Sequence, residues 1–261
     1  MVFGNKAKAT DIPEEYSRIK KVINRLARFN DLGSNPLVFT VIAGGYTGFL
    51  GSQGGESPEK FHLYRQLDPF RKDHDLETAE AIRQGYLFGD WEGYAFTNGT
   101  IAISRATFRI TQNVSNDAYL ACTLAHELGH VLGSHVFNES YDISILNKVH
   151  KRRSKRSKHL KSGISRMYET LADESGWEMM ANAGYKQESC INALKLLYES
   201  SGLGAVTSAS DTHPGYKDRV KSLKRYMNER GLSARQKTNS TNGTWNYNAD
   251  LNTLSFIPDV Y

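Results

Sequence analysis

The feature that most constrains this chain is the segment His126-Glu127-Leu128-Gly129-His130, which lies inside a strongly apolar run. Asn116 or Asp117 can cap a helix that continues through LACTLAHELGHVLGSHVF, with one broad apolar stripe at positions 120, 124, 128, 131 and 132. Residues four apart share a helical face, so His126 and His130 can bind a single Zn²⁺ ion. The chain must therefore fold so that another element brings a further ligand to this helix.

Glu127 lies beside the two histidines and is not expected to bind the metal. A carboxylate in that place can take a proton from an attacking water and later pass it to a leaving amine. The alternative is a helix whose histidines are only buried and hydrogen-bonded. Two imidazoles and a carboxylate on an apolar helix are costly to bury without a partner, which favours the metal site.

A catalytic zinc site needs a third protein ligand and one open position. The metzincin pattern requires a histidine at position 136, which is Val136, and His135 lies about 140° around the helix from His130. We therefore expect His135 to be a surface or packing residue. Glu169 is the better ligand, because it shares a helical face with Asp173, which can support a ligand histidine by accepting its free N–H.

Four blocks of sequence resemble a known group of zinc peptidases, that of the type I CAAX prenyl proteases, the HtpX-like heat-shock proteases and the soluble BepA-like periplasmic proteases. The blocks are Ala95-Phe96 followed by Gly99, LAHELGHVLGSH, ETLADESGWEMMANAGY, and Thr-His-Pro followed by Arg219. They occur in the family's order, and the resemblance spans roughly residues 94–228.

The resemblance implies a gluzincin fold in which His126, His130 and Glu169 hold one zinc ion. It also implies Glu127 as general base and Asp173 as the carboxylate behind a ligand histidine. In soluble relatives the histidine of the Thr-His-Pro block lies near the metal, a role that falls on His213. His213 would then guard or assist the open site, and the alternative is a plain helix-entry residue before Pro214.

The chain departs from the family's pattern around the segment Gly93-Tyr94-Ala95-Phe96, where Asn usually precedes Ala-Phe and Pro-Gly usually follows. The geometry of the strand that would bind substrate, carrying Ala95, Phe96 and Gly99, is therefore less well defined. The hydrophobic hairpins of the integral-membrane members are missing, so the chain looks like the soluble branch.

The remaining pattern predicts an α+β chain that is mostly helical, with a small sheet or hairpin beside the motif helix. An amphipathic helix is expected over residues 12–29, a buried strand over 37–43 and a hairpin over 94–104 around Asn98-Gly99. Further helices are expected over 75–84, 168–182, 187–199 and 214–230, the last three ending before Gly184, Gly202 and Gly231. The glycine-rich stretch 44–55 reads as a mobile loop rather than a phosphate-binding loop.

These elements predict a single metallopeptidase domain over residues 1–231, followed by a loosely packed polar tail over residues 232–261. Within the domain, the resemblance marks 94–228 as the core, 44–92 as a glycine-rich, variable segment and 148–166 as a basic loop.

The net charge of +5 is concentrated in one place, because residues 148–166 contain nine Lys or Arg and no acid, and subtracting these nine leaves −4 elsewhere. A uniformly basic nucleic-acid binder is therefore a poor description, and no nucleic-acid partner is expected. Residues 150–161 can make peripheral contact with acidic proteins or anionic lipid headgroups, the alternative being a solvated loop.

The sequence does not identify the compartment. It shows no apolar stretch long enough to span a bilayer and no signal peptide as it stands, so cytoplasm is the default and the resemblance suggests periplasm or cell envelope. Cys122 and Cys190 are expected to be small buried residues rather than a disulfide.

Together these features predict a zinc-dependent endopeptidase that acts on unfolded or extended protein segments, which would add as a strand beside the hairpin. His213, Arg219 and nearby tyrosines are candidates for stabilising the tetrahedral intermediate. The rival is a zinc-stabilised chaperone-like or binding module with little or no proteolysis.

Overall fold

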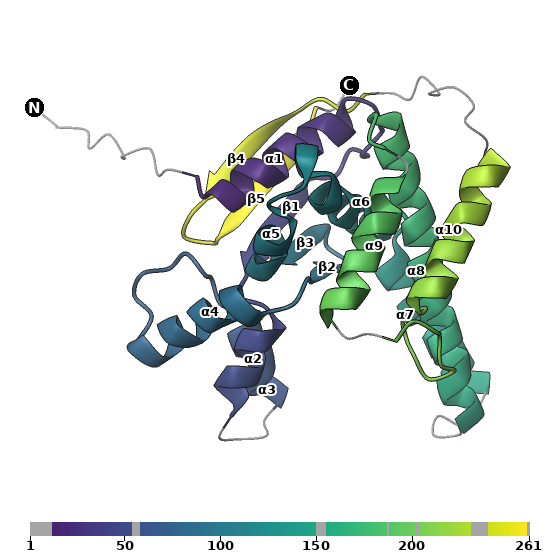
Figure 1. Cartoon of the computed structure of the whole chain (residues 1–261), viewed down its shortest axis with the longest axis horizontal. Coiled ribbons are helices and arrows are strands. Elements are labelled where there is room, and N and C mark those ends of the chain that lie inside the picture. The colour runs from purple at the N-terminus through teal and green to yellow at the C-terminus, as the bar shows by residue number, and fades with distance from the viewer. Residues whose placement is uncertain are drawn as a thin grey trace, which may run out of the picture.

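The computed structural model describes residues 12–53, 58–149, 155–186, 188–201, 204–230 and 240–259. Over these ranges the chain is mostly helical with one five-stranded sheet, which confirms the predicted α+β class (Figure 1). No helix in this part of the chain has the length and apolar character needed to cross a bilayer. The helices are α1 (Glu14–Ala27), α2 (Gly45–Ser52), α3 (Pro58–Arg65), α4 (Leu76–Phe88), α5 (Arg105–Thr111), α6 (Ala118–Leu132), α7 (His135–Val149), α8 (Lys155–Asn182), α9 (Glu188–Ser201) and α10 (Tyr216–Arg230).

The sheet has the order β2-β3-β1-β5-β4, so its strands come from both ends of the chain. β1 (Leu37–Ile42) pairs in parallel with β3 (Thr100–Ser104), while β2 (Gly93–Ala95), β4 (Gly243–Asn248) and β5 (Thr253–Pro258) pair antiparallel to their neighbours. The predicted strand over 37–43 and the predicted hairpin over 94–104 are both confirmed. β2 is the last strand at one edge, and this edge lies beside the motif helix α6.

The core forms where α1 and α6 pack against the sheet. The predicted amphipathic face of α1 is confirmed, because its apolar residues are fully or almost fully buried. They join the alternate inward residues of β1 and β3 and the stripe of α6 in one cluster. Its largest fully buried side chains include Tyr16, Phe39, Phe256, Ile19, Ile23, Leu26, Leu120 and Leu124. The core therefore holds the motif helix α6 against the sheet.

The predicted loosely packed tail is wrong for residues 243–258, because β4 and β5 form a hairpin that extends the sheet. Asn252, in the turn of that hairpin, accepts a hydrogen bond from Tyr16 Oη and donates one of 2.7 Å to the backbone of Val41. These bonds tie the hairpin to α1 and β1 inside the core. The alternation of Leu254 and Phe256 was the signal for a strand, but a polar composition masked it.

The glycine-rich stretch 44–55 is also different from its prediction, since residues 45–52 form helix α2. A Cβ at Gly48 would lie 2.7 Å from the carbonyl oxygen of Phe61, and one at Gly51 would lie 2.2 Å from the ring of Tyr64. The glycines therefore let α2 approach α3 closely, which is a packing function rather than a flexible one.

The region after the motif contains two further differences. The motif helix ends at Leu132 and a separate helix, α7, begins at His135, with Ser134 in the left-handed region between them. The basic segment predicted as a loop is helical from Lys155 onward, as the first turns of α8. Residues 150–154 of this segment lie outside the described part of the chain, as do residues 232–239 and 260–261 of the predicted tail. The predicted end of α8 before Gly184 is confirmed.

Helices α6 and α8 approach each other backbone to backbone at two glycines. A Cβ at Gly129 of α6 would lie 3.0 Å from the carbonyl oxygen of Ala172, and one at Gly176 of α8 would lie 2.9 Å from the backbone nitrogen of His126. Such distances leave no room for a larger side chain on either helix. This close approach sets the spacing between the motif and the residues of α8 that face it.

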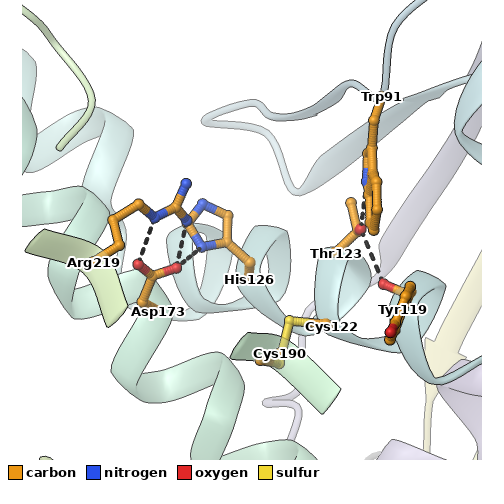
Figure 2. Close-up of a disulfide and its surroundings, with 8 residues drawn as sticks. All are labelled: Trp91, Tyr119, Cys122, Thr123, His126, Asp173, Cys190 and Arg219. Atoms are coloured by element: carbon orange, nitrogen blue, oxygen red, sulfur yellow. Dashed lines mark hydrogen bonds and ion pairs between the residues drawn. A yellow bond between two sulfur atoms is a disulfide. The ribbon is translucent and has the colours of Figure 1, made fainter. Parts of the chain in front are cut away.

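A disulfide joins Cys122 of α6 to Cys190 of α9 (Figure 2). The expectation of two separate buried cysteines is therefore wrong. The cysteines are 68 positions apart in sequence, and only the packing of α9 on α6 brings their Cα atoms to 5.4 Å. Nothing in the spacing of two isolated cysteines could show this pairing.

We expect Gly176→Ala to destabilise the protein by about 1–3 kcal/mol, because the added methyl group presses on the backbone of α6. Gly163, on the same helix, is the matched control, since a Cβ there would lie 3.8 Å from an Arg166 side-chain nitrogen, an ordinary contact distance. Gly163→Ala should raise stability by about 0.5–1 kcal/mol through helix propensity. Urea unfolding measures both, and equal stability of the two variants would refute the close-packing argument.

Removing the disulfide with Cys122→Ala and Cys190→Ala together should lower the free energy of unfolding by about 4 kcal/mol, because a long loop in the unfolded chain is no longer closed. Urea unfolding with and without a thiol reductant provides the check. The reductant should weaken the wild-type protein and leave the double variant unchanged. Two titratable thiols in the untreated, denatured wild-type protein would contradict the pairing.

Candidate active site

Three side chains from two helices converge on one point. His126 Nε2 and His130 Nε2 of α6 are 3.2 Å apart, and each lies 3.5 Å from a different carboxylate oxygen of Glu169 on α8. All three side chains are largely buried, with 11–16% of their surface exposed. Sequence reasoning named these residues, and the packing of α6 on α8 brings them together.

The three groups fit a zinc ion. Zinc bonds to nitrogen and oxygen of about 2.0–2.1 Å place the ligand atoms of a tetrahedral centre about 3.3 Å apart, close to the separations within this cluster. Imidazole and carboxylate are ligands that zinc accepts, and their ligand atoms lie within 4.8 Å of one another. The burial of Glu169 tends to raise its pKa, but hydrogen bonds with His126 and His130 outweigh burial and lower it. The carboxylate is therefore in its ionised, metal-binding form.

Behind the cluster, Asp173 and Arg219 form a buried chain that ends on His126 (Figure 2). Arg219 of α10 donates from Nε and Nη2 to the two oxygens of Asp173 at 2.7 and 2.5 Å. Asp173 Oδ1 lies 3.0 Å from His126 Nδ1. Burial tends to raise the pKa of Asp173, but Arg219 and the hydrogen bond from His126 lower it to about 2. An ionised Asp173 accepts the Nδ1 proton, so Nε2 is the His126 nitrogen that faces the cluster.

Arg219 contacts a different group from the one expected. It was one of the candidates for stabilising a reaction intermediate, but both of its bonded nitrogens are held by Asp173 and the side chain is buried. Its position makes it the support of Asp173. The sequence signal was present in the block after Thr-His-Pro, without an indication of the partner.

Glu127 is buried between α6 and the edge strand. A Cβ at Gly93 of β2 would lie 2.6 Å from Glu127 Oε1, so the glycine allows the strand to pass directly over the carboxylate. Burial raises the pKa of Glu127, while the charges of His126 and His130 oppose that rise. A raised pKa brings the carboxyl group closer to the range in which it can exchange protons near neutral pH. Nothing in the sequence indicated that position 93 needs a glycine.

The strand expected to meet substrate forms the sheet edge. Ala95 pairs with Ile101 in β3, the backbone of Phe96 continues the pairing to Thr100, and Gly99 takes the positive φ of 81° in the turn. Trp91, just before β2, donates from Nε1 to Thr123 Oγ1 of α6 at 2.8 Å (Figure 2). This bond, which the sequence did not suggest, anchors the strand to the motif helix.

His213 reaches the cluster from the loop before α10. Its Nε2 lies 3.4 Å from Glu169 Oε1, while 61% of its side chain is exposed. His213 therefore stands on the solvent side of the three converging groups, opposite the buried Asp173. Both predicted roles, guard and helper, are compatible with that place.

His135 is a packing residue and is not one of the three converging groups. It is buried, with its ring 5.2 Å from that of His130 and 5.3 Å from that of Tyr168. The expectation of a surface or packing histidine is confirmed in its packing form.

One known family matches the chain. The family model described as Peptidase family M48 matches residues 89–227, just over half of the chain, from the segment before β2 into α10. The matched region contains the three converging groups, Glu127, His213 and the pair Asp173–Arg219. No curated protein and no solved structure matches the chain. The chain belongs to peptidase family M48, a family of metal-dependent peptidases.

Proposed function

We propose that this protein is a zinc-dependent endopeptidase that hydrolyses peptide bonds in unfolded or extended protein segments. The observation that carries the proposal is the approach of His126, His130 and Glu169 to within bonding range of one point, with Glu127 next to them. A zinc site that only stabilises structure usually has four protein ligands, whereas three ligands and a nearby carboxylate are the set that catalysis needs.

In this proposal His126, His130 and Glu169 hold one zinc ion per chain. When bound, the ion supplies a Lewis acid that polarises the scissile carbonyl and makes a water molecule more acidic. Asp173 and Arg219 keep His126 in the tautomer and orientation that ligation requires.

Glu127 acts as the general base. Its carboxylate takes a proton from the attacking water and gives it to the nitrogen of the leaving amine, so that the same group serves both halves of the reaction. Its burial supports this role, because a raised pKa makes the carboxylate a stronger base toward the proton of the water. Gly93 keeps the strand close without displacing the carboxylate.

Substrate would lie along β2, the edge strand, in extended form. An edge strand offers unpaired backbone groups to an incoming chain, and such pairing reads little of the side-chain sequence. Ala95, Phe96 and Gly99 would then position the substrate by their place on the hairpin. Folded proteins would be poor substrates, because their backbone groups are already paired.

The narrower resemblance, to the soluble relatives of the HtpX-like and BepA-like proteases, is part of the same proposal. The disulfide adds a suggestion about compartment, since disulfides persist in oxidising environments such as the periplasm or the outside of the cell. This observation favours the cell envelope over the cytoplasm.

A second candidate function is a zinc-stabilised binding module with little proteolysis. It is favoured by the 3.4 Å approach of His213 Nε2 to Glu169, because a histidine there could close the remaining metal position. The two functions differ in what His213 and Glu127 do, and both can be tested by substitution.

We expect Glu127→Gln to abolish casein cleavage, with a loss of at least about 100-fold, while about one zinc per chain is retained. Atomic absorption measures the metal and release of labelled peptides measures the activity. Glu199→Gln is the matched control, since Glu199 is an exposed residue of α9. Undiminished cleavage by the Glu127 variant would refute the mechanism, and a zinc-loaded wild-type protein without any cleavage would favour the binding module.

We expect His213→Ala to lower kcat about 100-fold with zinc retained, as removal of a group that stabilises the transition state does. His62→Ala, at an exposed histidine of α3, is the control. Faster cleavage would instead identify His213 as a guard. Loss of zinc from this variant would identify it as a fourth ligand and support the binding module.

A further inference from the structure

An apolar face with no partner in the described part of the chain runs along the helices α7 and α8. On α7 the exposed apolar residues recur every four positions, and on α8 they continue at helical spacing. Their exposed fractions lie between 39% and 71% for Phe137, Tyr141, Ile145, Val149, Leu160, Met167 and Leu171. His135 is the only buried residue of α7, all of whose positions are described.

The two rows lie on the same side of the helix pair. Glu139 bonds to Ser165, and the ring of His135 packs on Tyr168, which marks the sides by which the helices touch. Around each helix axis, the apolar row lies about a quarter turn from the side that touches the other helix, and the direction of that turn along the chain is the same on both helices. The two helices are separated by only five residues and run antiparallel. In an antiparallel pair, equal turns of this kind place both apolar rows on the same face of the pair. Figure 1 shows this pair extending away from the sheet.

Basic residues continue both rows at the end of the pair. Lys148 follows three residues after Ile145, and Arg156 stands four residues before Leu160, so each continues an apolar row. Both side chains are exposed, and neither forms an ion pair with a residue that the structure describes.

Carboxylates are turned away from this face. Between 135–149 and 155–171 the acidic residues are Glu139, Asp142 and Glu169, and all of them have partners. Glu139 accepts a hydrogen bond from Ser165, and Asp142 accepts one of 2.8 Å from Tyr168. Glu169 belongs to the group of three side chains that could bind a metal ion. Over residues 135–149 and 155–171 the face therefore combines apolar side chains with cations and presents no anion. Glu174, three residues after Leu171, is the first acid that follows the α8 row.

We propose that this face binds the surface of an anionic lipid bilayer. Helices that lie in a membrane interface place apolar and aromatic side chains below the headgroups and Lys or Arg beside them, as found here. A nucleic acid would form ion pairs with the cations but leave the apolar rows exposed to water. Because α7 begins beside His130 and α8 contains Glu169, the bound protein holds its metal cluster close to the bilayer.

The test is flotation of the full-length protein with vesicles of phosphatidylcholine containing phosphatidylglycerol, compared with pure phosphatidylcholine. We expect binding to the anionic vesicles, and weaker binding at high salt. Phe137→Ser or Ile145→Ser should lower the affinity about tenfold each, because an inserted apolar side chain is lost. Lys148→Gln and Arg156→Gln should lower it about fivefold each.

Matched controls separate the face from general surface effects. Leu251→Ser changes an equally exposed apolar residue in the β4–β5 turn, and Lys221→Gln with Lys224→Gln removes the same charge from α10. These controls should bind vesicles as the wild type does, and all variants should keep the wild-type melting temperature and zinc content.

Several results would overturn the proposal. The first is that the wild type does not bind anionic vesicles at low salt, and the second is that the control variants lose as much binding as the face variants. The third is that the wild type forms a dimer without lipid and that Phe137→Ser dissociates this dimer. Binding to polyglutamate or to DNA as tight as to vesicles, and indifferent to Phe137→Ser, would identify a purely electrostatic partner instead. Peptidase activity does not enter the assay, so its outcome is independent of the proposed reaction.

Discussion

The backbone contact between α6 and α8 is the constraint on which the site depends. Gly129 and Gly176 let two helices approach until one side chain of α8 reaches both imidazoles of α6. A wider spacing would leave His126 and His130 as a buried pair without their carboxylate, which is an unfavourable arrangement in an apolar core. Close packing therefore creates the conditions for metal binding before any metal is present.

Two further supports keep that contact in place. On the buried side, Arg219 and Asp173 neutralise each other and hold His126 from behind, so that α10 is tied to the junction of α6 and α8. At the N-terminal end of α6, the disulfide holds α9 and the bond from Trp91 holds the edge strand. The motif helix is thus fixed by neighbours on several sides, while the cluster stays open toward His213.

The sheet explains how distant parts of the chain serve one site. β1 and the β4–β5 hairpin build the central and far strands, and α1 is locked to both through Tyr16 and Asn252. This frame positions β3, and β3 positions the edge strand β2 above Glu127. The β4–β5 hairpin therefore contributes to the placement of the proposed base, although none of its residues lies in the site.

The sequence by itself determined the helices with strong periodicity, the strands of the central sheet, and which residues could bind a metal ion, His126, His130 and Glu169, because residue type and local spacing carry that information. Only the tertiary structure decided the pairing of Cys122 with Cys190, the partner of Arg219, the role of the glycines in α2 and the place of the C-terminal hairpin. Each of these depends on which surfaces meet in space. A contact between residues far apart in the chain leaves no periodic trace in either segment, so local patterns could not reveal it.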